Sequence, residues 1–140
     1  MLNILERKRK KQFIDIELIM KQGFKKFLKS FYHAGRGVGL GFKQRNMKVH
    51  GGVAIAVLML GWYVNLSLTE WFMVMILIAL VFMAEIVNTS IEELANVVKK
   101  KNYCDYEETR VTRDLAAGAV LVVAFISGAL GLMIFLPKLL

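Results

Sequence analysis

Two long stretches of apolar residues dominate the second half of the chain. Trp71–Ala84 contains no charged or strongly polar residue, and Leu115–Leu136 contains no charged residue. A helix needs about 20 apolar residues to cross the hydrocarbon core of a bilayer. Val53–Leu66 is a shorter apolar run, which flanking glycines and a polar turn can extend. The pattern predicts an all-α integral membrane protein with three transmembrane helices, over about residues 51–68, 70–97 and 114–136.

A short polar turn, Asn65–Glu70, joins the first two expected spans. A connection of this length predicts a helical hairpin, because it leaves no room for another element. Ser67 and Glu70 have the spacing of a capping box, in which each side chain satisfies a backbone N–H at the start of a helix. The second span is therefore expected to begin at this turn.

The N-terminal region is basic and amphipathic. Its apolar residues recur at roughly helical spacing among lysines, which is typical of a helix on a membrane surface; they are Ile14, Leu18, Phe24, Phe27, Leu28 and Phe31. Each lysine near an anionic leaflet contributes about 1 kcal/mol, so an anionic lipid surface is an expected partner. Acidic residues within Phe13–Met20 and the absence of a cleavage signature argue against a signal peptide. We expect a basic extension over residues 1–29 and a membrane domain over 30–140.

Positive charge is distributed unevenly along the chain. The 140 residues are 56% apolar and carry a net charge of +8, with 19 lysines and arginines. Most of these basic residues precede residue 50, several lie in 88–114, and none lies in 64–70. The positive-inside rule then predicts a cytoplasmic N-terminus and 88–114 segment, with the turn and the C-terminus outside. This distribution excludes an ordinary soluble enzyme. No nucleic-acid motif accompanies the basic residues, and a lone Cys104 excludes a disulfide framework.

A stripe of polar residues lies at the end of the second expected span. Glu85, Asn88, Glu92 and Asn96 fall at i, i+3, i+7 and i+11, which keeps them on one helical face. A carboxylate at membrane depth is costly and by default marks a functional site. One carboxylate can act as a base and a second can hold Mg²⁺, a combination that suits phosphoryl transfer to a lipid hydroxyl. A structural ion pair at Glu85, a proton relay and ion transport are the alternatives.

Arg113 and Asp114 directly precede the third expected span. An arginine there can bind a phosphate through two hydrogen bonds, or it can serve only as an interfacial anchor. Asp114 can cap the third helix or contact a nucleotide.

Glycines alternate along Gly35–Gly41. The segment lacks the Lys-Ser or Lys-Thr of a phosphate-binding loop and follows no strand. We therefore favour a loosened surface helix or close helix packing over a nucleotide loop.

The sequence resembles the prokaryotic diacylglycerol kinase and undecaprenol kinase family. The resemblance rests on the signature Ala84–Glu92 and on shorter motifs in the family's order over roughly residues 30–138; these are Ser30-Phe31, Arg45–His50, Leu66–Trp71 and Arg113–Val120. It implies a homotrimer of three-span subunits in the bacterial plasma membrane, each preceded by a surface helix. The implied reaction transfers the γ-phosphate of ATP to a lipid alcohol with Mg²⁺, in active sites shared between subunits.

The resemblance also implies roles for individual residues. Glu85 is expected to take the proton of the lipid hydroxyl, while Asn88 orients groups around it. Glu92 is expected to bind Mg²⁺ beneath the ATP phosphates. Asp114 matches an aspartate of the nucleotide site, where Arg113 is expected to help hold the phosphates.

Three positions depart from the family pattern. Gln44 stands where the family has a metal-binding glutamate, and its neutral amide would assist Glu92 more weakly than a carboxylate. Asn96, at the nucleotide site, replaces an aspartate, and Arg113 replaces a lysine. The prediction is a kinase for undecaprenol or diacylglycerol. A catalytically impaired member that acts as a membrane scaffold or regulator is the alternative, and an ion- or proton-coupled carrier is a weaker one because no inverted repeat is visible.

Overall fold

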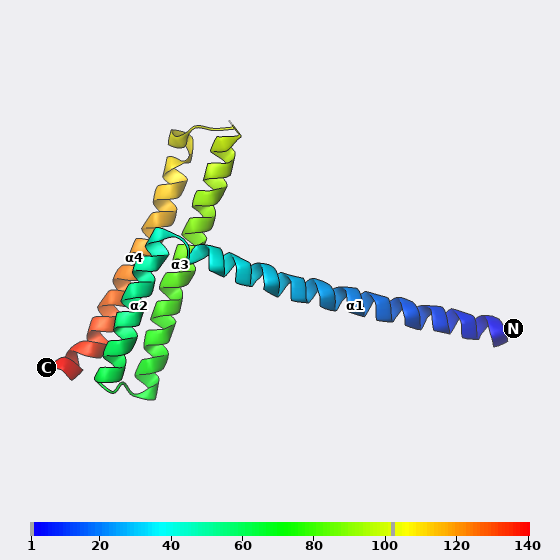
Figure 1. Ribbon diagram of the computed structural model, residues 1–140, viewed down its shortest axis with the longest axis horizontal. Coiled ribbons are helices and arrows are strands. Elements are labelled where there is room, and N and C mark those ends of the chain that lie inside the picture. The colour runs from blue at the N-terminus through cyan, green and yellow to red at the C-terminus, as the bar shows by residue number, and fades with distance from the viewer. Residues whose placement is uncertain (1, 102) are drawn as a thin grey trace. The chain divides into compact units, whose positions relative to one another are not determined.

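The computed structural model describes the backbone of residues 2–101 and 103–140, and the side chains of residues 20–101 and 103–140. The described chain is all-α, as expected (Figure 1). Its four helices are α1 (Leu2–Gly41), α2 (Arg45–Tyr63), α3 (Leu68–Lys100) and α4 (Tyr106–Leu139). Residues up to Gly39 form one unit, and Leu40–Leu140 forms another.

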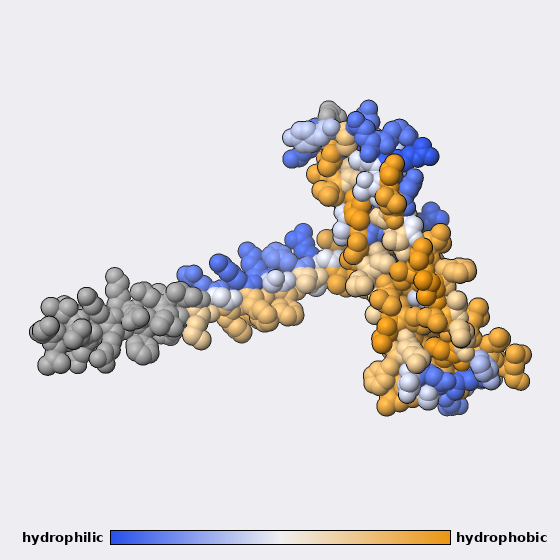
Figure 2. All heavy atoms as spheres, turned by 180° about the vertical axis from the view of Figure 1, so that it is seen from behind, coloured by the Kyte–Doolittle hydropathy of each residue, from blue (hydrophilic) through white to orange (hydrophobic). Residues whose placement is uncertain are grey.

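Helix α1 is amphipathic where its side chains are described. Hydrophilic side chains line one side of it and hydrophobic ones the other (Figure 2). Phe24, Phe27 and Phe31 are all exposed on this helix. The expected amphipathic helix is therefore confirmed for residues 20–31, whereas Ile14 and Leu18 lie outside the described side chains. Contact of this helix with a membrane stays a prediction.

The glycine-alternating segment is helical. Helix α1 runs through Gly35 and ends at Gly41, so the phosphate-loop alternative is wrong. Close packing occurs at Gly41, where an added Cβ would lie 3.2 Å from Cγ1 of Ile86 on α3. A Cβ added at Gly35, Gly37 or Gly39 would meet nothing within 4 Å.

Helices α2, α3 and α4 lie side by side (Figure 1). A small core of Leu66, Val74 and Phe135 joins them near the α2–α3 turn. Most other large apolar side chains are exposed, and they cover the middle of this unit while hydrophilic residues gather at its ends (Figure 2). This distribution is typical of helices whose apolar surface faces lipid.

Two of the three expected spans form helices that are long and apolar enough to cross a membrane, judged by length and composition alone. They are α3 and α4, whose most apolar windows have mean hydropathies of 2.3 and 2.7. Helix α2 has 19 residues, and its first turns carry Arg45, Lys48 and His50. A membrane crossing by α2 stays a prediction.

The hairpin is confirmed, but its first helix is shifted from the expected 51–68. Helix α2 begins at Arg45. It ends at Tyr63, because Asn65 soon afterwards adopts a left-handed φ of 54°. Asparagine tolerates this conformation better than most residues. Leu66 then turns inward and is buried in the core. The expected turn therefore contributes a core residue instead of extending the helix.

The capping box at the start of α3 is confirmed. The backbone N–H of Ser67 donates to Oε2 of Glu70 over 2.6 Å, and the backbone N–H of Glu70 donates to Oγ of Ser67 over 3.4 Å. The same Glu70 oxygen lies 3.1 Å from Nζ of Lys138, near the end of α4. This ion pair connects the beginning of α3 to the end of α4.

Helix α4 begins at Tyr106, ahead of the expected 114. The backbone N–H of Asp105 donates to Oε2 of Glu108 over 2.7 Å, so the helix start lies here. Asp114 is inside the helix, two turns from its start. The alternative in which Asp114 caps this helix is therefore wrong.

Candidate functional site

The polar stripe of α3 passes from buried to exposed along the helix. Glu85 and Asn88 are 2% and 3% exposed, and they are the two buried polar residues of the described part of the chain. Glu92 is half-buried, and Asn96 is exposed. All four lie on one helix at the spacing that the sequence indicates.

A polar pocket of about 180 Å³ lies between this stripe and the start of α2. It is lined by Gln44, Arg45, Asn46, Glu85, Thr89 and Glu92. The structure thus brings together Gln44, Glu85 and Glu92, three of the residues singled out from the sequence.

Local packing brings the start of α2 against α3. Gly41 lacks a side chain, and this allows the end of α1 to approach Ile86 closely. Met47 is fully buried one turn into α2. Gln44, between these two anchors, has an extended backbone at the N-cap position of α2. The polar residues 44–46 therefore face the carboxylates of α3.

Asn88 holds the carboxylate of Glu92. Its Nδ2 donates to Oε1 of Glu92 over 3.2 Å, one helical turn away. Its Oδ1 is buried and has no hydrogen-bond partner among the described residues. A buried acceptor without a partner costs about 1–3 kcal/mol, so this atom is available to a donor from outside the chain.

A second polar cluster joins α3 to α4. Nη2 of Arg113 donates to Oδ1 of Asn96 over 3.0 Å, and its Nε donates to Oγ1 of Thr109 over 3.3 Å. The guanidinium also lies 5.1 Å from the centre of the Tyr106 ring. Neither Arg113 nor Asn96 lines the polar pocket.

Asp114 is also outside the polar pocket. Its side chain is 73% exposed, and its Oδ2 lies 3.8 Å from Nε of Arg110, one turn earlier on α4. Asp114, Arg113 and Asn96 therefore do not line the pocket that contains Glu85 and Glu92.

Sequence reasoning assigned no role to three residues of the polar pocket. Thr89 lies four residues after Glu85 and three before Glu92, so helical spacing alone could have placed it on the same face. Arg45 and Asn46 follow Gln44 directly. Their position against α3 depends on a contact between segments about 40 residues apart, which no local pattern indicates.

The donor set of the pocket suits a hard cation. Carboxylate, amide and hydroxyl oxygens are the ligands that Mg²⁺ prefers. Among the described residues, no group of three or more histidine, cysteine, aspartate or glutamate side chains could hold a metal. The pocket instead combines the two carboxylates of Glu85 and Glu92 with amides, a hydroxyl and the positive charge of Arg45. Such a set can bind a cation and an anionic group together.

The sequence is similar to known proteins over the region that contains the polar pocket. Residues 32–135 match the family model for prokaryotic diacylglycerol kinase. The chain is 43% identical over 115 residues to undecaprenol kinase of Bacillus subtilis, covering 81% of this chain and 91% of that protein. It is 31% identical over 114 residues to diacylglycerol kinase of Synechocystis sp., covering 81% of this chain and 64% of that protein. No solved structure matches significantly.

The resemblance inferred from the sequence motifs is thus confirmed. The matched region includes the polar pocket, the whole stripe of α3 and most of α4. ATP as a substrate and a lipid as its acceptor are implied by this family. The chain therefore belongs to the prokaryotic diacylglycerol kinase family and is a membrane protein of the lipid-kinase type.

Proposed function

We propose that the protein transfers the γ-phosphate of ATP to the hydroxyl of undecaprenol or diacylglycerol at the cytoplasmic face of the membrane. The observation that carries this proposal is the buried carboxylate of Glu85, which lines one pocket with Glu92 and Gln44. Undecaprenol is the first candidate, because the relative that is 43% identical is an undecaprenol kinase. Diacylglycerol is the second, after the relative that is 31% identical.

The residues of the polar pocket have different roles in this proposal. Glu85 accepts the proton of the lipid hydroxyl as the oxygen attacks phosphorus. Glu92 and Gln44 hold Mg²⁺, and the hydrogen bond from Asn88 keeps the Glu92 carboxylate in one orientation. When bound, Mg²⁺ neutralises charge on the phosphates. Most of the catalysis is positioning and charge stabilisation.

Arg113, Asp114 and Asn96 contact the nucleotide in this proposal. Because they lie outside the pocket of their own subunit, the active site requires a neighbouring subunit. We therefore propose a homotrimer in which sites form between chains. The buried Oδ1 of Asn88, which lacks a partner within the described residues, supports a contribution from outside the subunit.

The proposed topology has three membrane spans, formed by α2, α3 and α4. The N-terminus and the connection between α3 and α4 lie in the cytoplasm, and the α2–α3 turn and the C-terminus lie outside. Residues 1–29 are a basic extension to a kinase domain over 30–140. The lysine-bearing side of α1 contacts the anionic cytoplasmic leaflet, while its phenylalanines enter the lipid.

The test is phosphoryl transfer by the purified full-length protein in detergent, with ATP, Mg²⁺ and either lipid alcohol. Wild type should phosphorylate at least one of them. Glu85→Gln should abolish transfer without dispersing the oligomer, because the amide keeps the shape but accepts no proton. Glu93→Gln, at an exposed position of the same helix, is the matched control and should retain activity. Equal transfer by wild type and Glu85→Gln would show that the assignment of the base is wrong.

A further inference from the structure

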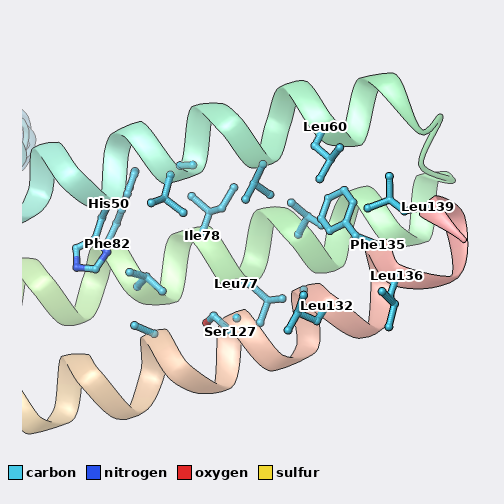
Figure 3. A pocket seen from close by; sticks show the side chains of 18 residues that line it. His50, Leu60, Leu77, Ile78, Phe82, Ser127, Leu132, Phe135, Leu136 and Leu139 are labelled. Atoms are coloured by element: carbon cyan, nitrogen blue, oxygen red, sulfur yellow. The ribbon is translucent and has the colours of Figure 1, made fainter.

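An apolar groove of about 370 Å³ lies between α2, α3 and α4 (Figure 3). This volume is within the range of about 300–1,000 Å³ that is usual for small-molecule sites. The polar residues of its lining are His50, at one end, and Ser127. The rest of the lining is apolar, and it includes Val57, Leu60, Leu77, Ile78, Leu132 and Phe135.

The apolar groove begins where the polar pocket ends, on two helices. On α2, Asn46 lines the pocket and His50, one turn later, lines the groove. On α3, Glu85 lines the pocket and Phe82, almost one turn earlier, lines the groove. In Figure 3, His50 and Phe82 lie together at one end of the groove, and Leu60 lies toward the other. The two sites therefore follow each other along α2 and α3, the first polar and the second apolar.

We propose that this groove holds the part of the acceptor lipid's hydrocarbon chain that adjoins its hydroxyl, while the hydroxyl itself lies in the polar pocket at Glu85. This inference rests on the proposed function and specifies its substrate as a lipid alcohol that is bound through one chain. A membrane lipid with a terminal hydroxyl has the same order of polar and apolar parts as the pocket and the groove.

The size of the groove favours a single chain as its occupant. At about 1.5 Å per helical residue, the lining extends for about 15 Å on α2, from His50 to Leu60, and for about 22 Å on α4, from Ala124 to Leu139. The volume of the groove then corresponds to a mean cross-section of about 16–25 Å². That cross-section fits one extended hydrocarbon chain. It is too small for a helix of a second copy, which is about 10–12 Å across.

Within a bilayer, the groove acts mainly by positioning. Lipid tails are as apolar as leucine side chains, so moving a chain from lipid into the groove changes its solvation little. The gain is that a chain aligned along the groove holds its hydroxyl near Glu85. Filling the groove should therefore impair long-chain acceptors and spare short ones that never occupy it.

Two glycines of α4 allow the groove to be filled without disturbing the backbone. Gly128 and Gly131 line the groove, and a Cβ added at either would meet nothing within 4 Å. Gly118 is the matched control, because it lies on the same helix, has the same free space and does not line the groove. The variants are Gly128→Leu, Gly131→Leu and Gly118→Leu.

The measurement compares kcat/KM for undecaprenol with kcat/KM for 3-methyl-2-buten-1-ol, an acceptor with a single prenyl unit, using full-length protein in nanodiscs. Gly128→Leu and Gly131→Leu should lower the undecaprenol value about tenfold and leave the value for the short alcohol unchanged. Gly118→Leu should change neither. Equal losses for both acceptors, or no loss for undecaprenol, overturn the inference, because damage to folding or assembly would affect both acceptors alike.

Photolabelling separates this inference from the proposed function. Undecaprenol with a diazirine in its chain is irradiated with the wild-type protein in the absence of ATP. Labels on Val57, Ile78 or Leu132 support the groove even if the protein phosphorylates none of the alcohols tested, in which case the proposed function alone fails. Labels confined to other surfaces of an active protein overturn the groove and leave the kinase assignment in place.

Discussion

The guanidinium of Arg113 on α4 donates a hydrogen bond to Oδ1 of Asn96 on α3, over 3.0 Å. Thr109 and Tyr106 contact the same guanidinium from α4. The contact between Arg113 and Asn96 connects the two long helices on either side of the turn that joins them. It holds Arg113 in one orientation and gives Asn96 a structural partner within the chain.

We expect Arg113→Gln to weaken this connection and the binding of ATP. Loss of a partly exposed, charge-assisted hydrogen bond should lower the free energy of unfolding by about 1 kcal/mol. If Arg113 contacts the nucleotide phosphates as proposed, KM for ATP should rise about tenfold. Thermal unfolding in detergent and ATP titrations measure the two effects. Arg110→Gln, whose described ion pairs lie within α4, is the control for stability. An unchanged KM for ATP in Arg113→Gln would contradict the nucleotide role.

We expect Gln44→Glu to strengthen Mg²⁺ binding. The substitution places a third carboxylate in a pocket that already contains those of Glu85 and Glu92, so the Mg²⁺ concentration for half-maximal activity should fall about tenfold. Gln22→Glu makes the same chemical change at an exposed position of α1 and should leave this concentration unchanged. The check is a Mg²⁺ titration of phosphoryl transfer.

A comparison of wild type with Gln44→Glu also tests the alternative that the protein is a catalytically impaired member of the family. A large gain in turnover on Gln44→Glu would mean that the natural glutamine limits the kinase. No turnover in either protein would favour a scaffold. An identical Mg²⁺ dependence in two active proteins would exclude Gln44 as a ligand.

We expect Gly61→Ala to destabilise the hairpin. A Cβ at Gly61 would lie 2.9 Å from Cδ1 of Leu66 and 3.0 Å from the Trp71 ring, so these two packed side chains would have to shift. Overpacking of this kind costs about 1–3 kcal/mol. Gly52→Ala, on the same helix, meets nothing within 4 Å and should instead stabilise by up to about 1 kcal/mol. Thermal unfolding in detergent should therefore show shifts of opposite sign, and two shifts of the same sign would count against this close contact.

We expect Lys138 and Glu70 to be energetically coupled. Their charged groups lie 3.1 Å apart, so the effects of removing each charge should not be additive. A double-mutant cycle with Lys138→Met and Glu70→Gln measures this coupling. Glu70→Gln alone should cost more than Lys138→Met, because a neutral amide oxygen accepts the two hydrogen bonds from Ser67 more weakly than a carboxylate does. Fully additive effects would show that the pair contributes nothing.

Features that depend on neighbours within one or two helical turns were predictable from the sequence. The capping box of Ser67 and Glu70 and the polar stripe that begins at Glu85 are set by spacings of three and four residues. The long apolar runs of α3 and α4 follow from composition in the same way. The family resemblance is likewise carried by short motifs, which the comparisons confirmed.

Contacts between distant segments were decided by the tertiary structure. Nothing near Asn65 in the sequence indicates that Leu66 turns into the core and so ends the first helix of the hairpin before residue 68. Gln44 lies beside Glu85 because Gly41 and Met47 pack the start of α2 against α3. Likewise, the alignment of the apolar groove with the polar pocket depends on how α2 and α3 are offset along their axes. Helical periodicity determines which face a residue occupies, but the packing of one helix on another determines what that face meets.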